Sequence, residues 1–144
     1  MFDPVEEKNF AFFRFEDLRV YHKALDYVAF LYKNVDQFPT DLKRDFLDVG
    51  NTIVLSISQG SFYSKPQFVN ILKEVKNPIR SCVVYTAIGQ RIGVFSDEQA
   101  TESNTHLMEL SKMLSAFIGS LRRQTSNNRQ QYDEEHLSEP NGFE

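Results

Sequence analysis

The sequence predicts an all-α protein, an up-down four-helix bundle followed by a disordered acidic C-terminal tail. Two observations lead to this prediction. Apolar residues recur at spacings of three and four through four long segments, which is the period of an amphipathic helix. Glycine, proline and serine fall between these segments, and no pair of alternating segments competes as strands. The 144 residues, 41% of them hydrophobic, fit one domain with a substantial core.

The first two helices are predicted near residues 15–36 and 40–60. Pro39 ends the connection between them, and Thr40 is the predicted N-cap of the second helix. The stretch 53–57 is rich in β-branched residues and would also suit a short strand. Because the helical period continues on both sides of that stretch, the helix is the preferred interpretation.

The third and fourth helices are predicted near residues 65–93 and 96–123. Each begins with a capping box, Ser64 to Gln67 in one case and Ser96 to Gln99 in the other. Pro78 lies inside the third helix, where it lacks the amide that would bond to the carbonyl four residues earlier. A kink is therefore expected near residues 74–78.

Three parts of the chain follow from this pattern: a leader over 1–13, a four-helix bundle over 14–123 and a disordered polar and acidic tail over 124–144. The leader carries aromatic residues that could attach it to the bundle or to another subunit. The net charge of −4 comes from the tail, which has five acidic residues against Arg129. The first 123 residues are neutral, which argues against a dedicated nucleic-acid binder.

Composition also predicts where the protein works. Cys82 is the single cysteine, so no internal disulfide can form and a reducing compartment is expected. No apolar run reaches the roughly 20 residues of a membrane span. The acidic N-terminus lacks the apolar run of a signal peptide. The protein is therefore expected to be cytoplasmic.

Several short motifs resemble one known family. Its opening pattern F-x-x-L-x-V-[WY]-x-K-A is similar to residues Phe15–Ala24, and its FP pair is similar to Phe38–Pro39. The segments Ile57–Gly60, Ser64–Phe68, Ile92–Ser96 and Met113–Arg122 resemble, in order, its I-A-E-G, S-x-x-E-F, L-G-Y-[IL]-S and M-L-x-x-L-I-x-S-L patterns. The chain thus resembles, over about residues 12–123, the bacterial four-helix-bundle proteins encoded by intervening sequences of 23S rRNA genes. Accessory variability proteins of diversity-generating retroelements are similar to that family.

The resemblance implies a left-handed bundle that assembles into a homo-oligomer, commonly a homopentamer. For the retroelement branch it also implies binding to a reverse transcriptase and to nucleic acid. The sequence departs from the family at two places. Leu47 and Asp48 stand where the family often has paired arginines, and Asn77–Pro78 replaces a small polar pair in the third helix.

A basic stripe on the third helix is the candidate nucleic-acid-binding site. At about 100° per residue, four cations project along one side, roughly opposite the apolar face. These residues, named here the predicted basic ridge, are Lys73, Lys76, Arg80 and Arg91. The ridge could follow a phosphate backbone, or it could be an ordinary solvated helix face.

No catalytic residue, metal site or cofactor is predicted. Asp41, Asp45 and Asp48 recur on one side of the second helix, but no His or Cys joins them at ligand spacing, so a solvated acidic face is preferred.

Cys82 falls on an apolar face, where it behaves as a small hydrophobe. His22, His106 and His136 form no paired metal-binding motif.

The expected function is therefore that of a non-enzymatic, self-assembling scaffold or accessory protein that acts through protein–protein contacts. The alternative is an accessory factor that binds RNA or DNA through the predicted basic ridge, as a possible partner of a reverse transcriptase. An enzyme would need a ligand or acid–base set that the sequence does not offer.

Overall fold

The computed structural model describes residues 15–137, with side chains up to residue 126. Every regular element in this part of the chain is helical, which confirms the all-α prediction. The predicted leader over residues 1–13 therefore lies outside the described residues, as does the end of the tail from residue 138. The elements are the 3-10 turn η2 (Phe15–Asp17) and the helices α2 (Arg19–Asn34), α3 (Thr40–Gly60), α4 (Lys65–Glu74), α5 (Lys76–Arg91) and α6 (Asp97–Leu137).

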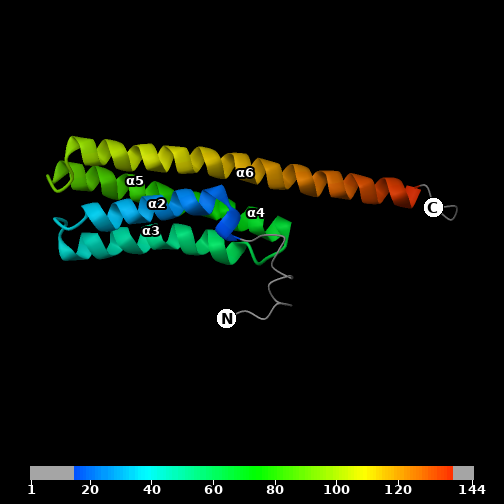
Figure 1. The fold of residues 1–144 in the computed structure, drawn as a ribbon, viewed down its shortest axis with the longest axis horizontal. Coiled ribbons are helices and arrows are strands. Elements are labelled where there is room, and N and C mark those ends of the chain that lie inside the picture. Colours follow the sequence, from blue (N-terminus) through cyan, green and yellow to red (C-terminus); the bar gives the residue numbers. More distant parts are fainter. Residues whose placement is uncertain (1–14, 138–144) are drawn as a thin grey trace.

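The helices pack as a bundle in which α4 and α5 together form the third rod (Figure 1). Helix α2 packs on α3 and α6, and α5 packs on the same two helices. Helices α2 and α5 therefore lie at opposite corners of the bundle. Consecutive rods run antiparallel and are joined by short turns, as an up-down topology requires (Figure 1).

Of the three N-cap residues predicted for these helices, two are confirmed. The Ser64 hydroxyl accepts from the Gln67 amide, and Ser96 and Gln99 form the same reciprocal pair at the start of α6. The prediction for Thr40 is wrong. Pro39 occupies the N-cap position of α3, and Thr40 is the first helical residue without a side-chain cap.

The expected kink in the third helix is an interruption at Val75, between α4 and α5. Pro78 falls in the first turn of α5, where a missing amide is tolerated. Gly93 has a φ of +81°, a left-handed conformation that ends this rod as predicted. The first predicted helix is also divided, because η2 precedes α2 and Leu18 separates them.

The last helix continues past its predicted end. The prediction ends it at 123, whereas α6 is helical to Leu137, so the helix boundary is corrected to that residue. The added part projects beyond the end of the bundle (Figure 1). Residues 124–137 contain neither Gly nor Pro, so no residue type that stops a helix is present there.

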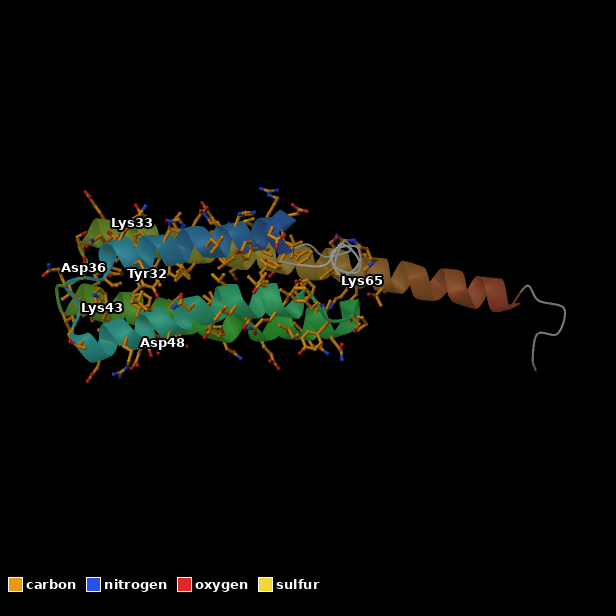
Figure 2. The ribbon with its side chains drawn as sticks, turned by 60° about the horizontal axis from the view of Figure 1, so that its bottom comes forward. Tyr32, Lys33, Asp36, Lys43, Asp48 and Lys65 are labelled. Carbon is orange, nitrogen blue, oxygen red and sulfur yellow. The ribbon has the colours of Figure 1, made fainter. Side chains whose placement is uncertain are left out.

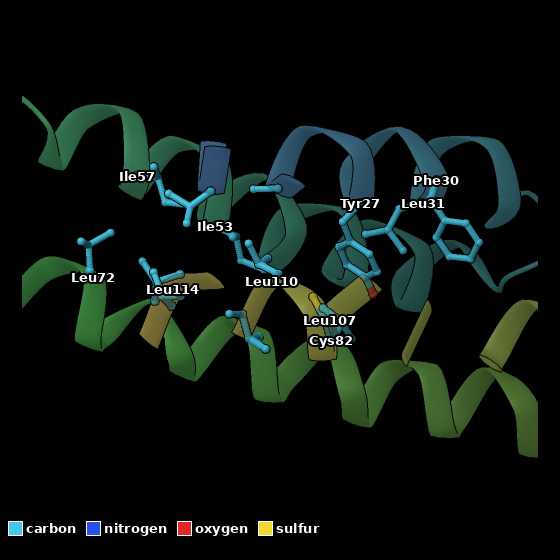
Figure 3. Close-up of a cluster of buried hydrophobic side chains, with 14 of the residues drawn as sticks. Tyr27, Phe30, Leu31, Ile53, Ile57, Leu72, Cys82, Leu107, Leu110 and Leu114 are labelled. Atoms are coloured by element: carbon cyan, nitrogen blue, oxygen red, sulfur yellow. The ribbon is translucent and has the colours of Figure 1, made fainter. Parts of the chain in front are cut away.

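The core runs along the whole bundle and is built from all four rods (Figure 3). Aromatic rings fill the end near the α2–α3 turn, where Phe38 packs against Phe46 and Phe95. Aliphatic residues such as Ile57, Leu72 and Leu114 line the other end (Figure 3), together with the buried Phe68, whose ring packs edge-on against Phe117. No helix of the described residues is both long and apolar enough to cross a membrane.

Candidate interaction surfaces

Large apolar side chains are exposed along the outer side of α5. Val84, Ile88 and Ile92 recur every fourth residue, and their exposed fractions are 56%, 38% and 51%. We call these three residues the α5 ridge. Helix α5 contains no acidic residue, and Arg80 and Arg91 lie before and near the end of the ridge. The surface thus combines apolar contact area with positive charge.

The α5 ridge divides the predicted basic ridge. Lys73, Arg80 and Arg91 are exposed as expected, and Lys76 is half-buried. Between Arg80 and Arg91 the helix presents Val84 and Ile88 to solvent instead of further cations. The structure therefore leaves three of the predicted cations near one end of α5 and separates Arg91 from them by two or more turns of helix.

A groove between α5 and α6 brings another cation toward Arg80. Its lining includes Val83 and Met108 on the apolar side and Arg80 and Lys112 on the charged side. No acidic side chain is among the described residues that line this groove. Arg80 and Lys112 share this groove through tertiary packing, so no local sequence pattern predicts that they do.

A second apolar surface lies on α2 and α3. Leu25, Tyr32 and Leu55 are all exposed there, and we call these residues the α2–α3 patch. The Asn51 amide donates to the Tyr32 hydroxyl at 3.1 Å across the two helices. Asp48 lies on α3 beside this patch, so its charge is opposite to that of the α5 ridge surroundings (Figure 2).

The three carboxylates predicted on α3 do not converge on a common point. Arg44 pairs with Asp41 at 3.6 Å and with Asp45 at 3.3 Å, and both contacts are exposed. No group of three His, Cys, Asp or Glu residues among the described residues could hold a metal ion. The acids of α3 are best described as a solvated surface with local ion pairs.

A chain of hydroxyl groups crosses the core. The Tyr27 hydroxyl lies 2.8 Å from that of Ser103, which lies 2.7 Å from that of Thr86. Cys82 is beside them and completely buried, as predicted (Figure 3). Burial raises the pKa of its thiol to about 12, so the reactive thiolate form is suppressed.

His106 lies against the rings of Tyr27 and Phe30, between α2 and α6. Its Nδ1 atom is buried without a hydrogen-bond partner in the described residues. Desolvation and then the charge of Lys23 lower the pKa of this histidine. His22 is exposed and its Nε2 contacts the Glu16 carbonyl. The third histidine, His136, lies where no side chain is described.

Neither a family model nor a curated protein matches this chain. The structure establishes an all-helical protein of four packed rods. The narrower likeness to the 23S rRNA intervening-sequence family depends on the sequence motifs alone.

Proposed function

We propose that this protein is a non-enzymatic, self-assembling scaffold or accessory protein, and that the α5 ridge is its main contact surface. The observation that carries the proposal is the regular exposure of Val84, Ile88 and Ile92 on a helix whose other face is already packed. Contiguous exposed apolar side chains on an otherwise polar surface are typical of protein–protein contacts.

The α2–α3 patch is the proposed binding surface for the α5 ridge of a second copy. It offers the apolar residues Leu25, Tyr32 and Leu55, with the carboxylate of Asp48 at its border. Because α2 and α5 occupy opposite corners of the bundle, such a contact is head-to-tail and can close into a ring. A homopentamer, which the family resemblance implies, is one such ring.

Two variants of similar exposure test this proposal by light scattering coupled to gel filtration. Val84→Asp places a carboxylate at the start of the α5 ridge and is expected to dissociate the assembly at micromolar concentration. Met108→Asp is the matched control, because Met108 is 54% exposed but lies in the α5–α6 groove. It is expected to keep the wild-type mass. Equal masses for both variants and the wild type would contradict the proposal.

Binding of RNA or DNA is the second candidate function, with a reverse transcriptase as the partner that the family resemblance implies. It is favoured by the groove in which Arg80 and Lys112 lie without an acidic neighbour in the lining. Binding should then depend steeply on salt, because cations that contact phosphates release counterions. Reversal of charge at Lys73, Lys76 and Arg80 should abolish it. Unchanged binding by the triple variant would rule out this surface.

A further inference from the structure

We propose that the α5–α6 groove binds an acidic amphipathic helix of a partner protein. The inference extends the proposed function, on which it rests, because it gives a protein that acts through protein contacts a second surface. The partner here is a different protein and not a second copy of the chain. The groove is separate from the α5 ridge, since Val83 lines the groove and Val84 does not.

The groove has the length and shape of a binding site for one helix. Its lining on α6 repeats at spacings of three and one over the stretch 101–112, which is one stripe of a helix. That stretch is about 16 Å long, or about three turns, and α5 forms the opposite wall. A docked helix would present anchor residues at the same spacing. The α6 residues of the lining are Thr101, Asn104, Thr105, Met108, Ser111 and Lys112.

Apolar side chains form the floor and parts of both walls. Ile79 and Leu107 belong to the buried core, so they close the bottom of the groove. Val83 on α5 and Met108 on α6 stand above them, and their exposed fractions are 44% and 54%. A helix that covers Val83 and Met108 with an apolar face would remove this surface from water, which favours association.

The two charged side chains of the groove are both cations. Arg80 and Lys112 are exposed, one on each wall. The Arg80 guanidinium donates to Oδ1 of Asn77 at 3.2 Å and pairs with no carboxylate in the part of the chain that the structure describes. Carboxylates beside the apolar face of a docked helix would therefore be attracted, and lysines in the same places would be repelled.

The acidic side chains of this part of α6 lie on its other side, toward α2. Glu109 pairs with Lys23 of α2. Glu102 and Glu109 both act on His106, whose ring lies against α2. The hydrogen bond from Lys23, and more weakly the charge of Lys112, lower the pKa of Glu109. Because Glu109 is already paired with Lys23, Lys112 remains available to a partner in the groove.

Polar atoms along the groove are available as well. The side chains of Thr101, Asn104, Thr105 and Ser111 form no hydrogen bond with other described residues. They can pair with polar side chains at the edge of a docked helix, as the rim of a protein–protein interface does. The groove thus combines an apolar floor, two cations and a polar edge.

A helix suits this lining better than nucleic acid, which is the second candidate function for the same surface. Proteins bind single strands by stacking bases on aromatic rings, and no described residue of the lining is aromatic. A duplex is held by many phosphate contacts, whereas Arg80 and Lys112 are the cations of this lining. Val83 and Met108 have a use in a helix contact and none in a phosphate contact.

Selection from a display library of helical peptides tests the proposal without assuming a sequence. The full-length chain is the target, and its Met108→Asp variant removes peptides that bind elsewhere. Enriched peptides should carry apolar residues at spacings of three and four, with Asp or Glu beside them. Enrichment of basic or uncharged peptides, or no enrichment over the Met108→Asp variant, would overturn the proposal.

Two double variants of the full-length chain then locate the site by fluorescence anisotropy. Arg80→Glu with Lys112→Glu should weaken binding of the best selected peptide by about tenfold or more. Lys73→Glu with Arg122→Glu is the matched control, because both cations are exposed on the same two rods and lie outside the groove. It should change the affinity by less than about twofold.

Charge reversal in the peptide shows whether the first variant still has a folded groove. A peptide whose acids are changed to lysine should bind the Arg80→Glu and Lys112→Glu chain more tightly than the wild type. Equal weakening by both double variants, or no recovery with the lysine peptide, would overturn the proposal.

The last measurements separate the groove from the α5 ridge and from nucleic acid. Ile92→Asp should lower the mass of the assembly and leave peptide binding unchanged. Loss of peptide binding in this variant would place the peptide on the α5 ridge and overturn the groove proposal, whereas an unchanged mass would count against the proposed function alone. An oligothymidylate of about 20 nucleotides should not displace the peptide. Displacement that the Arg80→Glu and Lys112→Glu changes abolish would assign the groove to nucleic acid and overturn the proposal.

Discussion

The Thr86 hydroxyl donates to the carbonyl of Cys82 one turn earlier in α5, at 2.7 Å. This bond sets the direction of the whole buried hydroxyl chain. Because the only proton of Thr86 is used, Ser103 must donate to Thr86, and Tyr27 must then donate to Ser103. The chain joins α2, α5 and α6 and satisfies every hydroxyl donor in it.

Ser103→Ala should therefore cost more stability than Tyr27→Phe. The first change removes the acceptor that lies 2.8 Å from the buried Tyr27 hydroxyl, at about 1–3 kcal/mol, whereas the second removes the Tyr27 donor itself and leaves no donor unpaired. The double variant should lose less than the sum of the two single losses. Urea unfolding monitored by circular dichroism measures all three. Strict additivity would mean that the hydroxyls do not act as a chain.

Gly89→Ala should destabilise the protein by about 1–3 kcal/mol. A Cβ atom at Gly89 would lie 2.4 Å from Cζ of Phe38. That ring is packed against Phe46 and Phe95 and has little room to move. Thermal unfolding of the variant measures the effect.

Gly119→Ala is the matched control for the glycine prediction. A Cβ there meets only the end of the flexible Arg123 side chain, at 3.4 Å. Because alanine favours a helix over glycine, this change should stabilise α6 by up to about 1 kcal/mol. Equal losses at Gly89 and Gly119 would show that the contact with Phe38 does not matter.

Stability should fall as the pH drops below about 6.5, because of His106. Burial against Tyr27 and Phe30 and the charge of Lys23 lower its pKa in the folded protein. The unfolded chain then binds a proton more readily, so acid favours unfolding in this range. In the His106→Gln variant, the free energy of unfolding should change less with pH between about pH 5 and 7. Parallel curves for variant and wild type would exclude this histidine as the cause.

The rods and most of their boundaries could be predicted because local chemistry determines them. Each boundary depends on residues within one or two turns of helix. Examples are the capping boxes that begin at Ser64 and Ser96, the interruption three residues before Pro78 and the turn at Gly93. The end of α6 was missed because a polar, aperiodic composition predicted disorder, although the segment has no residue that stops a helix.

The candidate surfaces were only partly predictable. The helical spacing predicted cations along the outer side of the third rod, and three of them, Lys73 on α4 and Arg80 and Arg91 on α5, are exposed. Val84 and Ile88 recur on the same side, and that spacing was the available signal for the α5 ridge. Two further features join residues from different helices, which no local sequence pattern encodes. They are the groove that Arg80 and Lys112 line and the buried chain of hydroxyl groups.

The mass of the wild-type chain in solution tests self-assembly most directly. Native mass spectrometry and light scattering over a dilution series down to low micromolar concentration provide that measurement. We expect one closed species whose mass is a whole multiple of the 16.7 kDa chain. A monomer of 16.7 kDa across the whole series would contradict the proposed function.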